Sequence, residues 1–242
     1  MKLIRRILFV LLFVLKLTEG FSQNAKEDFE KINAAFDVER LSMRISYDLY
    51  KNKDTKIVFQ KESGELKQSR TFKWMKVGQV ETIETDTYSL IIDHKGKAIS
   101  MLGKRLNQKE DKNKNPFKIN LDSILKMCEK VEFKKLNDQQ NSYDLVFPLS
   151  EYSKIKVVYN SKTFFMEKMI LYYNDAQDLE EKKGSPEEAP RLEIVCSDIN
   201  LDPIFTSNEY TYDTYLEKTA DGKWVCKPAY KGYAVSVHLL DE

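Results

Sequence analysis

The sequence is poor in cysteine, glycine, proline and histidine, and it has only one long hydrophobic run. Its 242 residues include 3 Cys, 8 Gly, 6 Pro and 2 His. So little glycine and proline excludes a collagen-like or low-complexity chain. A single apolar run excludes a protein that crosses a membrane several times. With two histidines and no CxxC motif, a zinc site built from Cys and His is not expected.

An excess of charge of either sign is also lacking. The chain has 39 Lys and Arg against 38 Asp and Glu, a net charge of +1. This balance does not support a broad nucleic-acid-binding surface, so we expect no nucleic-acid partner. Aromatic residues, in contrast, are plentiful at 12%, within a hydrophobic content of 42%. That composition can offset the entropic cost of ordering the chain, which argues against intrinsic disorder.

The single apolar run lies near the N-terminus and has the layout of a secretory signal peptide. Basic residues precede the unbroken apolar stretch Ile7–Leu15, and Gly20 and Ser22 occupy positions −3 and −1 of a cleavage site before Gln23. The run is shorter than the roughly 20 residues of a membrane span. An uncleaved signal anchor is the alternative.

Cleavage between Ser22 and Gln23 would leave an exported, periplasmic chain. The removed segment, residues 1–22, holds four basic residues and one acidic residue, so the net charge changes from +1 to −2. The remaining residues, 23–242, are expected to form one domain, and their number is compatible with one large β-rich domain or two small ones.

The spacing of apolar residues predicts two helices and many strands. Helical spacing covers Ala25 to about Leu41 and Leu121 to about Lys130. Elsewhere apolar and polar residues alternate, which is typical of strands with one buried face. Ten or more strands against two helices predict an α+β, mostly β chain: a single strongly curved antiparallel sheet, or half-open barrel, with the helices packed in its concavity. A two-domain split near residues 105–118 is the competing architecture.

Catalytic residues are not evident. Ser-His-Asp chemistry needs a histidine beside a nucleophile, whereas His94, in a hairpin turn, and His238, near the C-terminus, look like surface residues. The acidic pair Glu187-Glu188 lies in a charged loop rather than in the rigid cleft of a glycosidase. The sequence contains no phosphate loop, GxGxxG motif or calcium loop. We therefore expect a protein that is not an enzyme and has no cofactor and no metal.

The predicted strands carry a surplus of aromatic and aliphatic side chains. If the alternation holds, most of these side chains point to one face, and a curved sheet closed by only two helices leaves a hollow that they do not fill. Such a hollow would accept an acyl chain or another apolar ligand. The alternative interpretation is that the same side chains form an ordinary core. The predicted cavity residues are Met43, Ile45, Tyr47, Leu49, Ile57, Phe59, Phe72, Trp74, Ile83, Tyr88 and Leu90.

The three cysteines allow two interpretations. Export makes disulfides possible, and Cys196 and Cys226 both lie in strand-like C-terminal sequence, so a bridge between them is the best pairing. Three buried thiols are the alternative, because pairing cannot be read from a sequence. Cys128 lies on the apolar side of the second predicted helix and is expected to be a small buried side chain.

The predicted signal peptide and first helix are followed by a recurring layout of strand, short glycine hairpin and strand. The residues that carry this layout are Gly64, Leu66, Trp74, Gly78, Tyr88, Ile91, Ile92, Asp93, Gly96 and Lys97. Lys168–Tyr173, followed by Arg191–Ile194, looks like a pair of central strands of the same fold. This order resembles the LolA/LolB-like superfamily of periplasmic lipoprotein-carrier proteins over most of the mature chain. The resemblance implies a hydrophobic cavity lidded by helices, with a lipid or lipoprotein acyl chain as the partner.

The sequence favours two functions. The first is a periplasmic carrier or binding protein that holds a lipid-like or lipoprotein acyl ligand in a hydrophobic cavity. The second is a protein-interaction module of an envelope assembly, which would bind an envelope protein through exposed strand edges and the tyrosine-rich tail.

Overall fold

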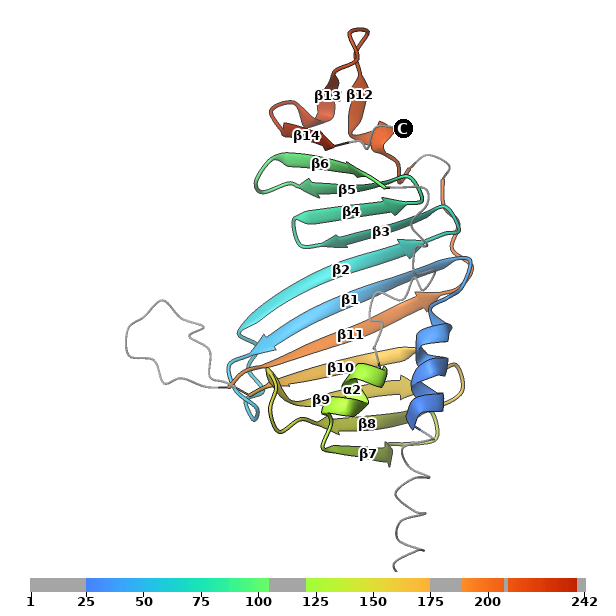
Figure 1. Ribbon diagram of the computed structural model, residues 1–242, viewed down its shortest axis with the longest axis vertical. Helices are drawn as coiled ribbons and strands as arrows, with labels where there is room; N and C mark the ends of the chain where they lie inside the picture. Colours follow the sequence, from blue (N-terminus) through green and yellow to red (C-terminus); the bar gives the residue numbers. More distant parts are fainter. Residues whose placement is uncertain (1–24, 105–120, 175–188, 207–208, 239–242) are drawn as a thin grey trace, which may run out of the picture. The chain divides into compact units, whose positions relative to one another are not determined.

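The computed structural model describes residues 25–104, 121–174, 189–206 and 209–238 (Figure 1). The predicted signal peptide, residues 1–22, lies outside the described residues, as do most of the acidic residues near Glu187. In the described part of the chain, no helix combines the length and hydropathy that crossing a membrane requires.

Strands dominate the described residues. The first helix covers residues 25–35, and α2 covers Leu121–Met127. The short 3-10 helices are η1, Tyr212–Thr214, and η2, Pro228–Tyr230. The strands are β1 Leu41–Tyr50, β2 Gln60–Gln68, β3 Phe72–Val77, β4 Val80–Thr85, β5 Tyr88–Asp93, β6 Ala98–Gly103, β7 Lys130–Lys135, β8 Gln140–Val146, β9 Tyr152–Asn160, β10 Met166–Tyr173, β11 Arg191–Asn200, β12 Leu216–Lys218, β13 Trp224–Cys226 and β14 Ala234–His238.

One 12-stranded sheet contains all of these strands except β12 and β13, which form a two-stranded sheet of their own. Its order is β14-β6-β5-β4-β3-β2-β1-β11-β10-β9-β8-β7. Neighbours from β2 to β6 and from β7 to β11 are antiparallel, whereas β14 lies parallel to β6. The predicted mostly β fold with one large antiparallel sheet is confirmed.

The chain divides into two compact units, each assembled from three separate stretches. The first unit comprises Met1–Asp37, Asp48–Gln60 and Asn115–Val195. The second unit comprises Val38–Tyr47, Lys61–Lys114 and Cys196–Glu242. Because β1 and β11 contribute residues to both units, the division does not correspond to a single linker.

In the first unit, the first helix packs on β8 and the loop before β10. The ring of Phe29 lies 5.2 Å from that of Tyr143, and the ring of Phe36 lies 5.2 Å from that of Phe165. The hydroxyls of Tyr143 and Tyr159 both donate to the Oδ2 of Asp28, at 2.9 and 2.6 Å. Burial and the neighbouring Asp28 carboxylate raise the pKa of both tyrosines, so both remain hydrogen-bond donors. The helix is therefore held by apolar packing and by two hydrogen bonds to a carboxylate.

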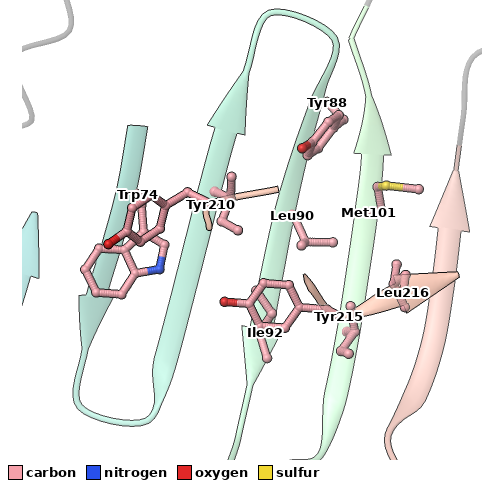
Figure 2. Close-up of a cluster of buried hydrophobic side chains, with 10 residues drawn as sticks. Trp74, Tyr88, Leu90, Ile92, Met101, Tyr210, Tyr215 and Leu216 are labelled. Carbon is pink, nitrogen blue, oxygen red and sulfur yellow. The ribbon is translucent and has the colours of Figure 1, made fainter. Parts of the chain in front are cut away.

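In the second unit, residues after β11 cover one face of β3–β6. Tyr210, Tyr215 and Leu216 pack against side chains of the sheet in a single core cluster (Figure 2). Tyr210 also lies 5.3 Å from Trp74 and 4.8 Å from Phe72, measured between ring centroids. The aromatic tail is thus a structural cover of this unit.

Both helices are shorter than the sequence predicts. The first ends at residue 35 rather than near Leu41, and Leu41 is instead the first residue of β1. The second ends at Met127 rather than near Lys130, where β7 begins. At both ends the pairing of a strand overrides continued helical spacing.

The predicted strand through Ile57 and Phe59 is also wrong, because β2 begins only at Gln60. The side chain of Asn52 accepts the backbone N–H groups of Asp54 and Thr55. The Nη1 of Arg191 also binds the carbonyl oxygens of residues 52, 53 and 55. The backbone groups of residues 52–55 are therefore bound by the Asn52 side chain and by Arg191, which is distant in the sequence, so these residues form a turn instead of a ladder.

The Asp28 hydrogen bonds predict a measurable loss of stability in Tyr159→Phe. A hydrogen bond to a charged group contributes about 1.5 to 3 kcal/mol, so urea unfolding followed by circular dichroism should show a loss of about 1.5 kcal/mol. Tyr50→Phe is the control, since no hydrogen bond of its hydroxyl is seen among the described residues. Equal unfolding midpoints for the two variants would contradict the role of Asp28.

Candidate functional site

Five of the predicted cavity residues lie together in one cluster of mostly buried side chains. Trp74, Ile83, Tyr88 and Leu90 belong to one buried cluster, and the partly buried Phe72 packs against it. Ile83 and Leu90 have no solvent exposure. Figure 2 shows Tyr210 of the tail beside Trp74 and Tyr215 beside Ile92 of the same cluster. The chain's own aromatic tail packs on this apolar face.

The other six predicted cavity residues are not part of this cluster. Met43 and Ile45 are buried in β1, while Tyr47 and Leu49 further along the strand are half-buried. Ile57 and Phe59 are exposed, at 80% and 38%.

A buried carboxylate lies where the tail meets the sheet. Glu81 on β4 accepts hydrogen bonds from Trp74 Nε1 (3.3 Å), Lys76 Nζ (2.9 Å) and Tyr215 OH (2.7 Å). The Nε2 of His94 lies 2.9 Å from the same carboxylate. Because a carboxylate only accepts, we assign the Nε2 proton to His94. Glu81 therefore joins β3, the β5–β6 hairpin and the tail.

His94 is the residue that sequence reasoning missed. It was expected at the surface, but its side chain is only 19% exposed. Its Nδ1 lies 3.1 Å from the hydroxyl of Tyr233, so the ring bridges the sheet and the tail. The signal available in the sequence was the tyrosine-rich tail, which supplies the partner.

The electrostatics of Glu81 follow from these contacts. Burial alone would raise the pKa of its carboxyl group. The hydrogen bonds from Lys76, Tyr215 and His94 outweigh burial and lower the pKa to about 2. A carboxylate with so low a pKa is a poor general base at neutral pH. The cluster is suited to holding the tail in place rather than to proton transfer.

All three cysteines are free thiols, so the predicted bridge between Cys196 and Cys226 is not formed in the structure. Cys196 is buried in β11, and burial raises its pKa to about 12. Cys226, on β13, packs against the core of the second unit with its Sγ 3.6 Å from the carbonyl of Tyr233. Cys196 and Cys226 are therefore each placed by the packing of their own strand, whereas Cys128 lies between α2 and β7 and is half-buried instead of buried on the helix.

The first unit has an apolar sheet face that is only partly covered. Register places Val131, Leu145, Ile155, Leu171 and Leu192 side by side on neighbouring strands from β7 to β11. Leu145 is buried, and the other four are half-buried.

A second row on this face carries the contact with the first helix. It consists of Phe133, Tyr143, Val157, Met169 and Ile194. Tyr143 within it meets Phe29 of the helix. In Figure 1, α2 and the first helix are drawn on the same side of β7–β10. The half-buried aliphatic row is therefore on the helix-bearing side of the sheet, where an apolar ligand could complete its burial.

Among the described residues, no group of three or more His, Cys, Asp or Glu side chains is placed to hold a metal ion.

Comparison with known proteins gives similarity of structure only. No family model and no curated protein matches the sequence. An uncharacterized conserved protein from Thermus thermophilus is 8% identical, covers 89% of this chain and 99% of its own, and has a TM-score of 0.46. A LolA superfamily protein from Nitrosomonas europaea is 10% identical, with coverages of 78% and 98% and a TM-score of 0.31.

A putative outer membrane lipoprotein-sorting protein domain from Vibrio parahaemolyticus is also similar. It is 10% identical, covers 80% of this chain and 98% of its own, and has a TM-score of 0.34. LolA-like proteins are thus among the solved structures that the chain is similar to. All these TM-scores lie below 0.5. The proposed ligand is therefore argued from the side chains of this protein.

The low pKa of Glu81 predicts that the second unit loses stability in acid. A carboxyl group with a lowered folded-state pKa stabilises the protein fully above its ordinary pKa, near 4.5, and loses this contribution as the pH falls toward 2. At 1.36 kcal/mol per pKa unit, the contribution is roughly 3 kcal/mol. Glu81→Gln should be less stable at pH 7 and should lose less stability between pH 5 and pH 3.

Urea unfolding followed by tryptophan fluorescence measures this effect, because Trp74 and Trp224 both lie in the second unit. Glu217→Gln is the matched control, since Glu217 is exposed on β12. If Glu81→Gln and the wild type lost the same stability between pH 5 and pH 3, the carboxylate would not be the anchor.

Proposed function

We propose that this protein is an exported, non-enzymatic carrier or binding protein for an acyl chain or a similar lipid-like ligand. The ligand lies against the partly covered apolar face of the first unit, beneath the helices. The N-terminal signal pattern supports export to the periplasm. The carrier resemblance in the sequence is consistent with this proposal.

The half-buried aliphatic row of β7–β11 is the observation that carries the proposal. Ile155, Leu171 and Leu192 are direct neighbours across three strands, and none of them is fully buried. Removing a methylene group from water contributes about 0.8 kcal/mol. Burying about six methylenes on this row would therefore contribute about 5 kcal/mol, enough for reversible binding and release.

The proposal moves the ligand away from the strands where the sequence placed it. The face around Trp74 and Leu90 is occupied by Tyr210, Tyr215 and Leu216. A ligand there would have to displace packed aromatic rings and the Glu81 hydrogen bonds. A ligand on the half-buried row of the first unit would not have to displace those side chains.

The second candidate is a protein-interaction module. Strand β14 is one of the two edge strands of the 12-stranded sheet, and an edge strand offers unpaired backbone groups to a partner strand. Beside it lies an open pocket of about 490 Å³ whose lining includes Trp224, Tyr233 and Val235. A stable envelope-protein complex that forms without any acyl ligand would favour this function.

A fluorescent fatty-acyl probe tests the carrier proposal. The wild-type protein should bind the probe saturably, and Leu171→Gln should weaken binding about tenfold, because a polar amide replaces roughly 1.5 kcal/mol of apolar contact. Leu149→Gln is the matched control in the same unit, since Leu149 is 95% exposed. Absence of probe binding by the wild type, or equal affinities for the two variants, would contradict the proposal.

A further inference from the structure

The sheet of the first unit carries a charged face opposite its apolar face. The register aligns Lys134 with Ser142 and Val158, and aligns Glu132 with Asp144 and Lys156. These positions alternate with those of the apolar rows. The basic residues on this face are Lys130, Lys134, Lys154, Lys156, Lys168 and Arg191, and the acidic ones are Glu132, Asp144, Glu167 and Glu193.

The acidic side chains on this face are less exposed to solvent than the lysines. Their exposed fractions are 33% for Glu132, 8% for Asp144 and 13% for Glu193. The lysine side chains extend further into solvent, with exposed fractions of 64% for Lys130 and 49% for Lys134. Lys130, Lys134 and Lys168 therefore lie further out than their carboxylate partners, whereas Arg191, at 10% exposure, lies as deep as Glu193.

Two lysines in the middle of the face have no acidic partner among the described residues. The Nζ of Lys154 lies 4.2 Å from the ring centroid of Tyr172, and Lys156 forms no ion pair there. Their side chains are half-exposed. Since the chain beyond residue 22 has a net charge of −2, this face concentrates cations on a protein that is negative as a whole.

We propose that this lysine face docks on the surface of a bilayer that contains anionic phospholipids. The lysines lie on β7, β9 and β10, and because neighbouring strands are about 4.8 Å apart, they span roughly 14 Å across the sheet, so a small anion could reach only one or two of them. Lysine is a mobile point charge suited to a diffuse anionic plane, whereas arginine suits bidentate recognition. The half-exposed Tyr172 beside Lys154 is of the type that sits at lipid headgroups. The inference does not depend on acyl binding, which uses the opposite face.

Vesicle flotation tests this inference. The purified protein should float with vesicles of equal phosphatidylglycerol and phosphatidylcholine, and not with phosphatidylcholine alone. Raising the salt from about 0.05 to about 0.5 M should release it, because the Debye length shortens. Each lysine near an anionic surface strengthens partitioning about fivefold. The double variant Lys154→Gln and Lys156→Gln should therefore weaken partitioning onto the vesicles about thirtyfold.

Control variants distinguish the effect of where the charges lie from the effects of net charge and of misfolding. Lys218→Gln with Lys223→Gln removes the same charge from the exposed β12–β13 hairpin of the second unit and should float like the wild type. Lys154→Arg with Lys156→Arg should also float, since it keeps both charges. Leu171→Gln should float as the wild type does, so a failed acyl-binding proposal would leave this result intact.

Three outcomes would overturn the inference. They are absence of flotation with anionic vesicles, equal flotation with phosphatidylcholine alone, and equal losses in the two lysine-to-glutamine pairs. Binding to duplex DNA or to polyglutamate without binding to vesicles would also overturn it, since the partner would then be a soluble polyanion.

Discussion

Every apolar sheet face in this protein needs a cover, and the two units meet that requirement differently. A sheet buries an apolar face only by packing another element on it. In the second unit the cover is the aromatic tail, anchored where Tyr215 and His94 meet the Glu81 carboxylate. In the first unit the cover is helical and incomplete, so Ile155, Leu171 and Leu192 remain half-buried. The proposed function depends on that difference.

Much of the fold could be predicted from the sequence. Alternation of apolar and polar residues located most strands, because one face of each strand is buried. The hairpin turn that contains His94 is also confirmed, and the positive φ angle beside it is at Lys97. Helix ends and the start of β2 were misplaced, since strand pairing and the Arg191 contacts with the turn at residues 52–55 depend on residues distant in sequence.

The candidate site was harder to predict for the same reason. Alternation shows that Trp74, Ile83 and Leu90 share a face, but it cannot show what lies on that face. The cover comes from Tyr210 to Leu216, which lie far along the chain from those strands. The register of β7–β11, which aligns the half-buried row, is likewise a long-range property. No local pattern reports either fact.

We propose that the ligand binds the half-buried aliphatic row of the first unit rather than the buried core cluster of the second. Methyl NMR of the protein with labelled Ile, Leu and Val side chains tests this most directly, during titration with a medium-chain fatty acid. The account predicts saturable shifts at Ile155, Leu171 and Leu192, with little change at Ile83, Leu90 and Ile99. Shifts confined to the latter three residues, or absent from both groups, would contradict it.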